Sequence, residues 1–381
     1  MKTHSVAQTE PHNLNNQGSS VEAGHTPLIQ FELDYIQFIN ERGEWVNNPP
    51  SFATEQWLID AYKHMSMNRV FDQKAIALQR TGQMGTYPSS LGQEAFGIGI
   101  GMALEADDVF VPYYRDHGAH ILRGHKIEDL FMYWGGDERG SATGPKQDFP
   151  VCVPIATQIT HAAGAAAALK IKGQENIALV TIGDGGTSKG DFFEALNVAG
   201  AWQLPMVVLV NNNQYAISVP RSIQCGAPTL AQKAIGAGIH GVQVDGNDVV
   251  AVYQAILEAR HRANTHKGAT LIEAMSYRLC DHTTADDASR YRENDEVKQA
   301  WEKEPIKRLQ TLLFNLNLWN PDKEQAWQNE CALKVDAAVQ KYLQVKQDTP
   351  ESMFDHLYQD WPEAMNEQLD LLSKKIERMK H

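Results

Sequence analysis

Apolar runs and helical repeats alternate through the middle of the chain. Residues 177–182 (IALVTI) are a short apolar and β-branched run, which is what a buried parallel strand requires. Residues 191–202 place apolar side chains on one stripe at helical spacing, and residues 206–210 (MVVLV), after Pro205, form a second apolar run. The pattern predicts a strand–helix–strand unit, whose crossover is almost always right-handed.

The remaining periodicity predicts an α/β fold in which helices flank a mainly parallel sheet. Residues 35–46 predict a short hairpin around Glu41-Arg42-Gly43, and residues 135–150 are a Gly/Pro-rich loop. The other predicted elements are helices at about 55–81, 157–172 and 248–265, and strands at 242–244 and 270–277.

Three parts follow along the chain. Residues 1–30 are polar and predict a flexible N-terminal arm. Residues 31–293 hold the alternating strands and helices of one α/β domain, and residues 294–381 predict a mostly helical, charged extension of that domain.

Composition narrows the classes of partner. The 381 residues include 47 acidic and 34 basic ones, a net charge of −13, without a basic patch. Nucleic acid and anionic membranes are therefore not expected as partners. Four widely separated cysteines, no membrane-length apolar run, and first residues without arginine or an apolar core together predict a bacterial cytoplasmic protein.

The chemistry concentrates at the ends of the two predicted central strands. Gly183-Asp184-Gly185 follows the first strand, and Asn212-Asn213 follows the second, with Asn213 twenty-nine positions after Asp184. Both groups therefore fall at the carboxyl ends of parallel strands, where open α/β sheets bind ligands. Carboxylate and amide oxygens suit Mg²⁺ or Ca²⁺, and glycines allow a diphosphate to approach backbone N–H groups. The pair predicts a metal-bridged diphosphate.

Other interpretations of these residues fit less well. A dinucleotide fingerprint needs a third glycine where Ser188 stands, and the chain has no P-loop pattern. Each half of the motif alone is typical of a tight turn. The two halves in register across one strand–helix–strand unit favour the binding site instead.

The stretch 182–218 (IGDGGTSKGDFFEALNVAGAWQLPMVVLVNNNQYAIS) resembles the thiamine diphosphate motif. From about Phe31 onward the chain is similar to the α subunit of the decarboxylating first component of 2-oxoacid dehydrogenase complexes, and most similar to its pyruvate-type members. The resemblance implies a thiamine diphosphate-binding fold, with thiamine diphosphate and Mg²⁺ as cofactors. The supporting segments, in the same order, are Leu91-Gly92-Gln93-Glu94-Ala95, Tyr113-Tyr114-Arg115-Asp116, Ala156-Thr157-Gln158-Ile159 and residues 277–292 (YRLCDHTTADDASRYR).

The resemblance also implies a role for individual residues. Metal ligands are expected to be the side chains of Asp184 and Asn213 and the carbonyl of Tyr215. His282 is expected to assist acyl transfer as a group titrating near neutrality. The implied cofactor-binding residues are Tyr114, Arg115, Ile155, Gly183, Asp184, Gly185, Gly186, Asn213, Tyr215 and His282.

Three of these residues have simpler interpretations from the sequence alone. Arg115 beside Asp116 is typical of a surface ion pair, and His282 lies in a polar segment typical of a solvated turn. Ile155 fits an ordinary core position equally well.

The implied activity is oxidative decarboxylation of pyruvate, with transfer of the acetyl group to a lipoyl group on the acyltransferase core. A separate β subunit, in an α₂β₂ heterotetramer, is expected to supply the glutamate that activates the cofactor, so this chain alone is expected to be inactive. Branched-chain 2-oxoacid and acetoin dehydrogenase α subunits remain alternatives, although Asn211 stands where branched-chain relatives have arginine. A nicotinamide-dependent dehydrogenase and a non-enzymatic binding module are further alternatives. Thr283 stands where mammalian relatives carry a regulatory serine, which argues against control by a kinase.

Overall fold

The computed structural model describes residues 29–346, 348–355 and 357–379. The predicted N-terminal arm, residues 1–30, lies outside the described residues up to position 28. The chain divides into a first unit that ends at Glu32, of which the described residues form no helix or strand, and a second unit that begins at Leu33. The second unit contains all the elements given below.

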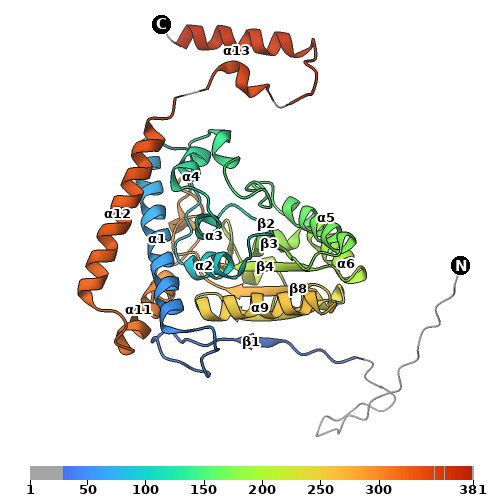
Figure 1. The fold of residues 1–381 in the computed structure, drawn as a ribbon, viewed down its shortest axis with the longest axis vertical. Helices are drawn as coiled ribbons and strands as arrows, with labels where there is room; N and C mark the ends of the chain where they lie inside the picture. The colour runs from blue at the N-terminus through green and yellow to red at the C-terminus, as the bar shows by residue number, and fades with distance from the viewer. Residues whose placement is uncertain (1–28, 347, 356, 380–381) are drawn as a thin grey trace, which may run out of the picture. The chain divides into compact units, whose positions relative to one another are not determined.

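A parallel sheet forms the centre of the second unit (Figure 1). Every neighbouring pair of its six described strands is parallel, which confirms the predicted α/β class. In spatial order the strands are β1 (Asp34–Ile36), β7 (His240–Asp245), β8 (Thr270–Met275), β4 (Met206–Asn212), β3 (Ala178–Gly183) and β2 (Val109–Val111). A separate antiparallel hairpin consists of β5 (Tyr215–Ala216) and β6 (Val219–Pro220).

Helices surround the sheet and continue to the end of the described chain. The α-helices are α1 (Glu55–Arg80), α2 (Glu94–Ala103), α3 (His117–Leu122), α4 (Ile127–Trp134), α5 (Thr157–Lys172), α6 (Gly190–Ala201), α7 (Arg221–Gln224), α8 (Lys233–Gly236), α9 (Val249–Asn264), α10 (Asn294–Trp301), α11 (Pro305–Asn315), α12 (Pro321–Leu343) and α13 (Met365–Met379). The 3₁₀ turns are η1 (Glu138–Ser141), η2 (Asp184–Ser188), η3 (Ala288–Arg290) and η4 (Pro350–Met353). The predicted helix at 157–172 and the helical character after residue 294 are both confirmed.

The central strands are buried on both faces, as the continuous apolar runs predict. Along β3, Val180 and Ile182 pack in one core with α5 and α6, whereas Leu179 packs in the opposite core with α2 and α9. Figure 1 shows α5 and α6 together on one side of the sheet and α9 below it. Burying one such side chain contributes about 1.5–3 kcal/mol, so these two layers hold the strands in place.

The pairing of β3 with β4 carries the predicted motif. Their register places Gly183 opposite Asn211, so both strands end at the same edge. The second strand runs to Asn212, two residues further than its apolar run predicts. The Asn212 side chain donates to Glu273 at 2.7 Å, and this hydrogen bond allows the polar side chain to be buried within the strand. The apolar pattern ends before Asn212 and therefore predicts a shorter strand.

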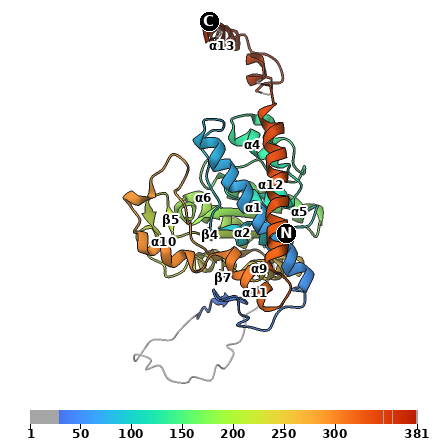
Figure 2. The same cartoon turned by 90° about the vertical axis from the view of Figure 1, so that its left-hand side faces the viewer.

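Further helices support the sheet from its sides. α12 runs alongside α1, and both pack with α4 in one apolar core (Figure 1). Figure 2 shows α10 on the side of the molecule that carries β5. The Tyr215 hydroxyl in β5 donates to Glu296 of α10 at 2.8 Å, so this contact ties the hairpin to the helical extension.

The predicted hairpin at residues 35–46 is confirmed in its turn, where the Val46 N–H donates to the Phe38 carbonyl, but not in its first residues. β1 instead joins the main sheet parallel to β7, and the only antiparallel pairing between the two ends of the segment is the bridge between Ile39 and Trp45. The Asp248 carboxylate accepts the N–H groups of Phe38 and Ile39, each at 2.7 Å. Because these donors are held by a residue two hundred positions away, the local pattern does not reveal the arrangement.

Two further observations concern the cysteines and the helices. All four cysteines lie within the described ranges, and each is free. Across the described residues, no helix combines the length and the apolar character that crossing a membrane requires.

Replacing Asp248 by alanine tests how far this buried carboxylate holds the edge of the sheet. Its carboxylate also caps α9 by accepting the N–H groups of Val250 and Ala251. Loss of the cap, and of the acceptor of the Phe38 and Ile39 N–H groups, should lower the free energy of unfolding by at least about 3 kcal/mol in urea titrations. The control is Thr54→Ala, which removes a cap that accepts a single N–H and should cost about 1 kcal/mol. Equal losses in the two variants would contradict this role.

Candidate functional site

A cavity of about 530 Å³ opens at the carboxyl ends of β3 and β4. It brings together every residue that the sequence predicts for the site, although these residues come from five separate segments of the chain. They are Tyr114, Arg115, Ile155, Gly183, Asp184, Gly185, Gly186, Asn213, Tyr215 and His282. The cavity is therefore the candidate site.

Asp184 is buried at the base of this cavity without a full set of partners. The residue is 1% exposed, and among the described residues its Oδ2 atom has no hydrogen-bond partner. Burial raises the pKa of Asp184 to about 6, although hydrogen bonds from backbone N–H groups and the charge of Arg278 act in the opposite direction. A buried carboxylate oxygen without a partner is costly, and a cation bound to it removes that cost. The position thus fits a hard metal ion.

Asn213 is oriented by a side chain that the sequence analysis does not assign to the site. Its Nδ2 donates to Oε1 of Gln93 at 2.9 Å. This hydrogen bond fixes which way the amide faces, so that its side-chain oxygen points away from Gln93. The chain then turns through Gln214, whose φ is 74°, and presents the Tyr215 carbonyl. Arg278 donates to that carbonyl at 3.3 Å, but a carbonyl oxygen has two lone pairs and can also coordinate a metal ion.

The glycines of the motif serve two different purposes. A Cβ at Gly183 would meet no atom within 4 Å, so the backbone there is open to a ligand in the cavity. At Gly185 a Cβ would lie 2.6 Å from Cβ of Ala216, and at Gly186 it would lie 2.5 Å from Cγ1 of Ile182. These two positions require glycine because the η2 turn packs tightly against its neighbours.

Buried Arg115 and half-buried His282 contact each other, so they are not two separate surface groups. Arg115 is 3% exposed, and its guanidinium donates to the carbonyl oxygens of Ser89 at 2.7 Å and His282 at 2.6 Å. Its Nη2 also lies 3.0 Å from Nδ1 of His282. The neighbouring Asp116 instead accepts hydrogen bonds from Thr181 and from the N–H of Tyr113, so the surface ion pair between Arg115 and Asp116 does not form.

This arrangement changes the expected acid–base behaviour of His282. Burial and the charges of Arg115 and Arg278 lower the pKa of His282 to about 3, and Asp286 only partly opposes them. In the ligand-free protein His282 is therefore neutral at physiological pH and does not titrate near neutrality. Because Nδ1 accepts from the guanidinium, the ring proton lies on Nε2.

Arg278 connects two loops, the turn between β5 and β6 that contains Ile217 and the segment that contains Tyr291. Its guanidinium donates to the Ile217 carbonyl at 2.8 Å and to the Tyr291 hydroxyl at 2.9 Å. Ile155 also lines the cavity and is 46% exposed, so it is not an ordinary core isoleucine. The adjacent apolar side chains of Val153 and Ile217 are also exposed at the cavity.

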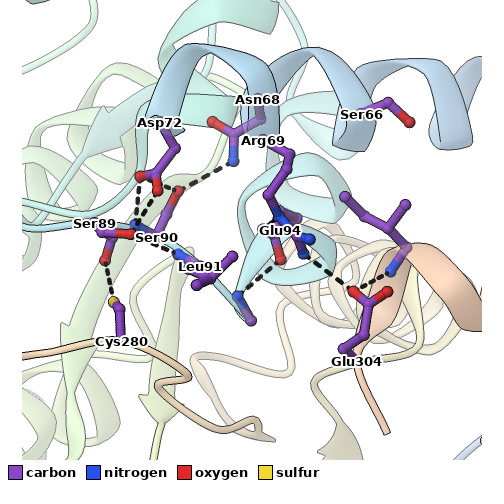
Figure 3. A network of polar contacts seen from close by, with 12 residues as sticks. Ser66, Asn68, Arg69, Asp72, Ser89, Ser90, Leu91, Glu94, Cys280 and Glu304 are labelled. Atoms are coloured by element: carbon purple, nitrogen blue, oxygen red, sulfur yellow. Dashed lines mark hydrogen bonds and ion pairs between the residues drawn. The ribbon is translucent and has the colours of Figure 1, made fainter. Parts of the chain in front are cut away.

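A buried polar network fixes the position of Arg115. Figure 3 shows the part of this network that contains Asp72, Ser89 and Ser90. Asp72 of α1 accepts hydrogen bonds from the Tyr87 hydroxyl at 2.9 Å and from the Ser90 N–H at 2.8 Å, and also from the Ser89 hydroxyl. The Ser89 carbonyl is then the acceptor for Arg115. A carboxylate on the first helix therefore positions the loop that holds the guanidinium. The sequence alone carries no sign of this link.

A second part of the network supports α2 (Figure 3). Arg69 forms ion pairs with Glu94 and with Glu304, and Glu94 also accepts the N–H of Gly92 at 3.0 Å. Gln93 lies between Gly92 and Glu94, so these contacts hold it beneath Asn213. No local pattern in residues 91–95 predicts a role at the site, and only the family resemblance points to this segment. The contact between Gln93 and Asn213 explains its place near the site.

Asn211 does not line the cavity. It is fully buried and donates to Gln93 at 3.1 Å and to the Tyr113 hydroxyl at 2.8 Å. Its side-chain oxygen accepts from the Ser276 hydroxyl at 2.5 Å. Asn211 therefore supports the residues around the cavity from behind.

The fold and the cavity define an α/β protein with a cavity at the carboxyl edge of a parallel sheet, the edge where open α/β sheets bind ligands. The family model of the dehydrogenase E1 component matches residues 62–351. The chain belongs to this family, which confirms the family resemblance.

Relatives with assigned names are similar over most of the chain. The pyruvate dehydrogenase E1 component subunit alpha of Staphylococcus aureus (strain Mu50 / ATCC 700699) is 39% identical over 351 residues, which cover 91% of this chain and 94% of the relative. The subunit of the same name from Staphylococcus epidermidis (strain ATCC 12228 / FDA PCI 1200) is 38% identical over the same shares of both chains. Both of these relatives are bacterial.

Asp184→Asn tests whether this corner of the cavity binds a metal ion. The amide is nearly isosteric but removes the charge, so binding of thiamine diphosphate with Mg²⁺ should weaken by more than about 100-fold, measured by calorimetry with the β partner present. Without ligands the variant should be at least as stable as the parent at pH 8. Because the pKa of Asp184 is raised in the folded state, its protonated carboxyl group favours folding at low pH. This contribution to the free energy of unfolding is lost as pH rises through about 6.

The matched control for Asp184→Asn is Asp191→Asn, at the start of α6 and outside the cavity lining. This variant should bind the cofactor and Mg²⁺ as the parent does. Equal affinities for all three proteins would remove Asp184 from the metal site.

The pKa of His282 is open to direct measurement. Nuclear magnetic resonance of ¹³C-labelled histidine, assigned with His282→Gln, should show a neutral ring down to about pH 4 in the ligand-free protein. Inorganic pyrophosphate bound beside Arg115 should raise the pKa, because its negative charge offsets the guanidinium. A midpoint near 6.5 without ligand, or no change on adding pyrophosphate, would contradict the arrangement.

Proposed function

We propose that this chain is the α subunit of an enzyme that oxidatively decarboxylates pyruvate and transfers the acetyl group to a lipoyl group on an acyltransferase core. The cofactors in this proposal are thiamine diphosphate and Mg²⁺. The observation that carries it is the coincidence, in one cavity, of an unpaired buried carboxylate at Asp184, an open backbone at Gly183 and a buried guanidinium at Arg115. These are the three elements that a metal-bridged diphosphate needs.

Each of these residues has a separate task in the proposed site. Asp184, Asn213 and the Tyr215 carbonyl would hold the metal ion, and Arg115 with Tyr114 and the glycine turn would hold the diphosphate. Thiamine diphosphate, when bound, supplies the electron sink that a 2-oxoacid needs to lose carbon dioxide.

Two further residues act on the reactive part of the site. Ile155 is exposed on the cavity wall, where an apolar side chain can pack against the organic part of the cofactor. His282 carries its proton on Nε2 in the ligand-free state, so it can donate that proton to an oxygen or sulfur that becomes anionic during acyl transfer. A bound diphosphate raises the pKa of His282 and eases the return of the proton.

A β subunit completes the proposed enzyme. Asp184 is the only acidic side chain among the described residues that line the cavity, so its use as a metal ligand leaves no carboxylate there for proton transfer to the cofactor. Val153, Ile155 and Ile217 expose apolar surface at the same cavity, which favours burial against a partner chain. Both observations support an α₂β₂ assembly in which the partner supplies the missing acid.

The pyruvate preference rests on the relatives and on one position. The two staphylococcal relatives carry the name of pyruvate dehydrogenase subunits. Asn211, where branched-chain relatives have arginine, is neutral and fully buried behind the site. The four free cysteines and the bacterial relatives support a location in a bacterial cytoplasm.

Parallel substrate assays test the proposal. The chain co-purified with its β partner, thiamine diphosphate and Mg²⁺ should reduce an artificial electron acceptor with pyruvate. Its kcat/KM for pyruvate should exceed that for 3-methyl-2-oxobutanoate by about 10-fold or more, because the two extra methyl groups of the larger substrate must fit a pocket that is shaped for pyruvate. The α chain alone should show no turnover.

Each other outcome has a definite meaning. A higher kcat/KM with 3-methyl-2-oxobutanoate or acetoin would keep the cofactor site and overturn the substrate. Turnover by the α chain alone would overturn the need for a β subunit. No turnover with any substrate, combined with no cofactor binding, would overturn the proposed function itself.

A further inference from the structure

A second cluster of metal-ligating side chains lies outside the cavity. His120 is on α3, His125 follows it on the turn to α4, and Asp148 is held at the edge of β2 by a bridge to Phe110. One nitrogen of each histidine and one carboxylate oxygen all lie within 4.8 Å of one another. The two imidazole rings meet edge to face, with centroids 4.6 Å apart.

The donors of this cluster are buried and incompletely paired. His120 is 2% exposed, and within the described part of the chain neither of its ring nitrogens has a hydrogen-bond partner. Nε2 of His125 is buried and likewise without a hydrogen-bond partner there. Each such group costs about 1–3 kcal/mol if nothing binds it.

Asp148 already has one charged partner and keeps room for another. Arg123 donates from Nε to both carboxylate oxygens, at 2.7 and 2.8 Å. A carboxylate has about four lone-pair sites, so two oxygens can serve a guanidinium and a metal ion together. The positive charge of Arg123 weakens the attraction of a cation, and the neutral imidazoles therefore provide most of the selectivity.

We propose that His120, His125 and Asp148 bind one Zn²⁺ ion, with water as the fourth ligand. Two imidazoles and one carboxylate are typical zinc ligands, whereas Mg²⁺ and Ca²⁺ prefer oxygen alone. Tetrahedral zinc with bonds of about 2.0–2.2 Å keeps its ligand atoms about 3.3–3.6 Å apart. Nε2 of His125 and Oδ2 of Asp148 are 3.6 Å apart, close to that spacing, and the His120 ring closes the rest by rotating toward them.

The ion acts as a clamp between two walls of the cofactor cavity. α3 begins two residues after Arg115, and the segment after Asp148 leads directly to Val153 and Ile155. The site is separate from the proposed Mg²⁺ corner, which contains no histidine ligand. Zinc binding therefore stabilises the fold around the cavity and takes no part in the reaction.

Metal analysis of the assembled protein tests the inference. The tag-free chain with its β partner carries Asp184→Asn in every arm, so that the cofactor site does not compete for zinc. Zinc content is measured after dialysis, and Zn²⁺ affinity by competition with a chromogenic chelator. The test variant is His125→Gln, and the control is His261→Gln, an exposed position on α9. The protein with intact His125 should retain one zinc per α chain, and His125→Gln should bind Zn²⁺ at least about 100-fold more weakly than the control.

Two further measurements follow, and the first of them needs no variant of the cluster. Zinc X-ray absorption on the protein with intact His125 should show four nitrogen or oxygen ligands with the scattering pattern of imidazole. Thermal melting should show that Zn²⁺ raises the Tm of the control but not that of His125→Gln. The absence of retained zinc, equal affinities of the two variants, or a spectrum without imidazole would each overturn the proposal, whether or not the enzyme uses pyruvate.

Discussion

The parallel pairing of β3 with β4 is the constraint on which the site depends. Gly183 lies opposite Asn211, so the residues that follow each strand, Asp184 and Asn213, emerge at the same edge. Apolar layers on both faces hold the two strands in this register, because a shift by one residue would move each side chain out of the core that it fills and into the opposite one. The positions of the candidate ligand-binding residues therefore depend on apolar side chains that do not themselves contact a ligand.

Buried polar groups then convert this edge into a defined site. Asp72 holds the loop whose Ser89 carbonyl orients Arg115, and Arg115 in turn contacts His282. Almost every charge in this chain of contacts has a partner, which is the condition for burying it. The unpaired oxygen of Asp184 stands apart from this pattern, and a bound cation accounts for it.

The sequence predicts the parts of this structure that depend on local periodicity. The strand at 206–210 and the helix at 157–172 follow directly from their apolar patterns, and Asp184 and Asn213 follow from the strands they terminate. Gln93 could not be assigned in this way, because its role arises from a contact with Asn213 across 120 positions. The same holds for β1, whose place in the sheet depends on Asp248. Long-range polar contacts leave no periodic signal.

A crystal structure of the chain with its β partner, thiamine diphosphate and Mn²⁺ in place of Mg²⁺ tests the central claim most directly. Anomalous scattering locates the manganese independently of the protein. The account predicts one strong peak within bonding distance of Oδ2 of Asp184, the side-chain oxygen of Asn213 and the Tyr215 carbonyl, with the diphosphate between that ion and Arg115. Manganese elsewhere in the protein, or a diphosphate that does not touch Arg115, would contradict the account.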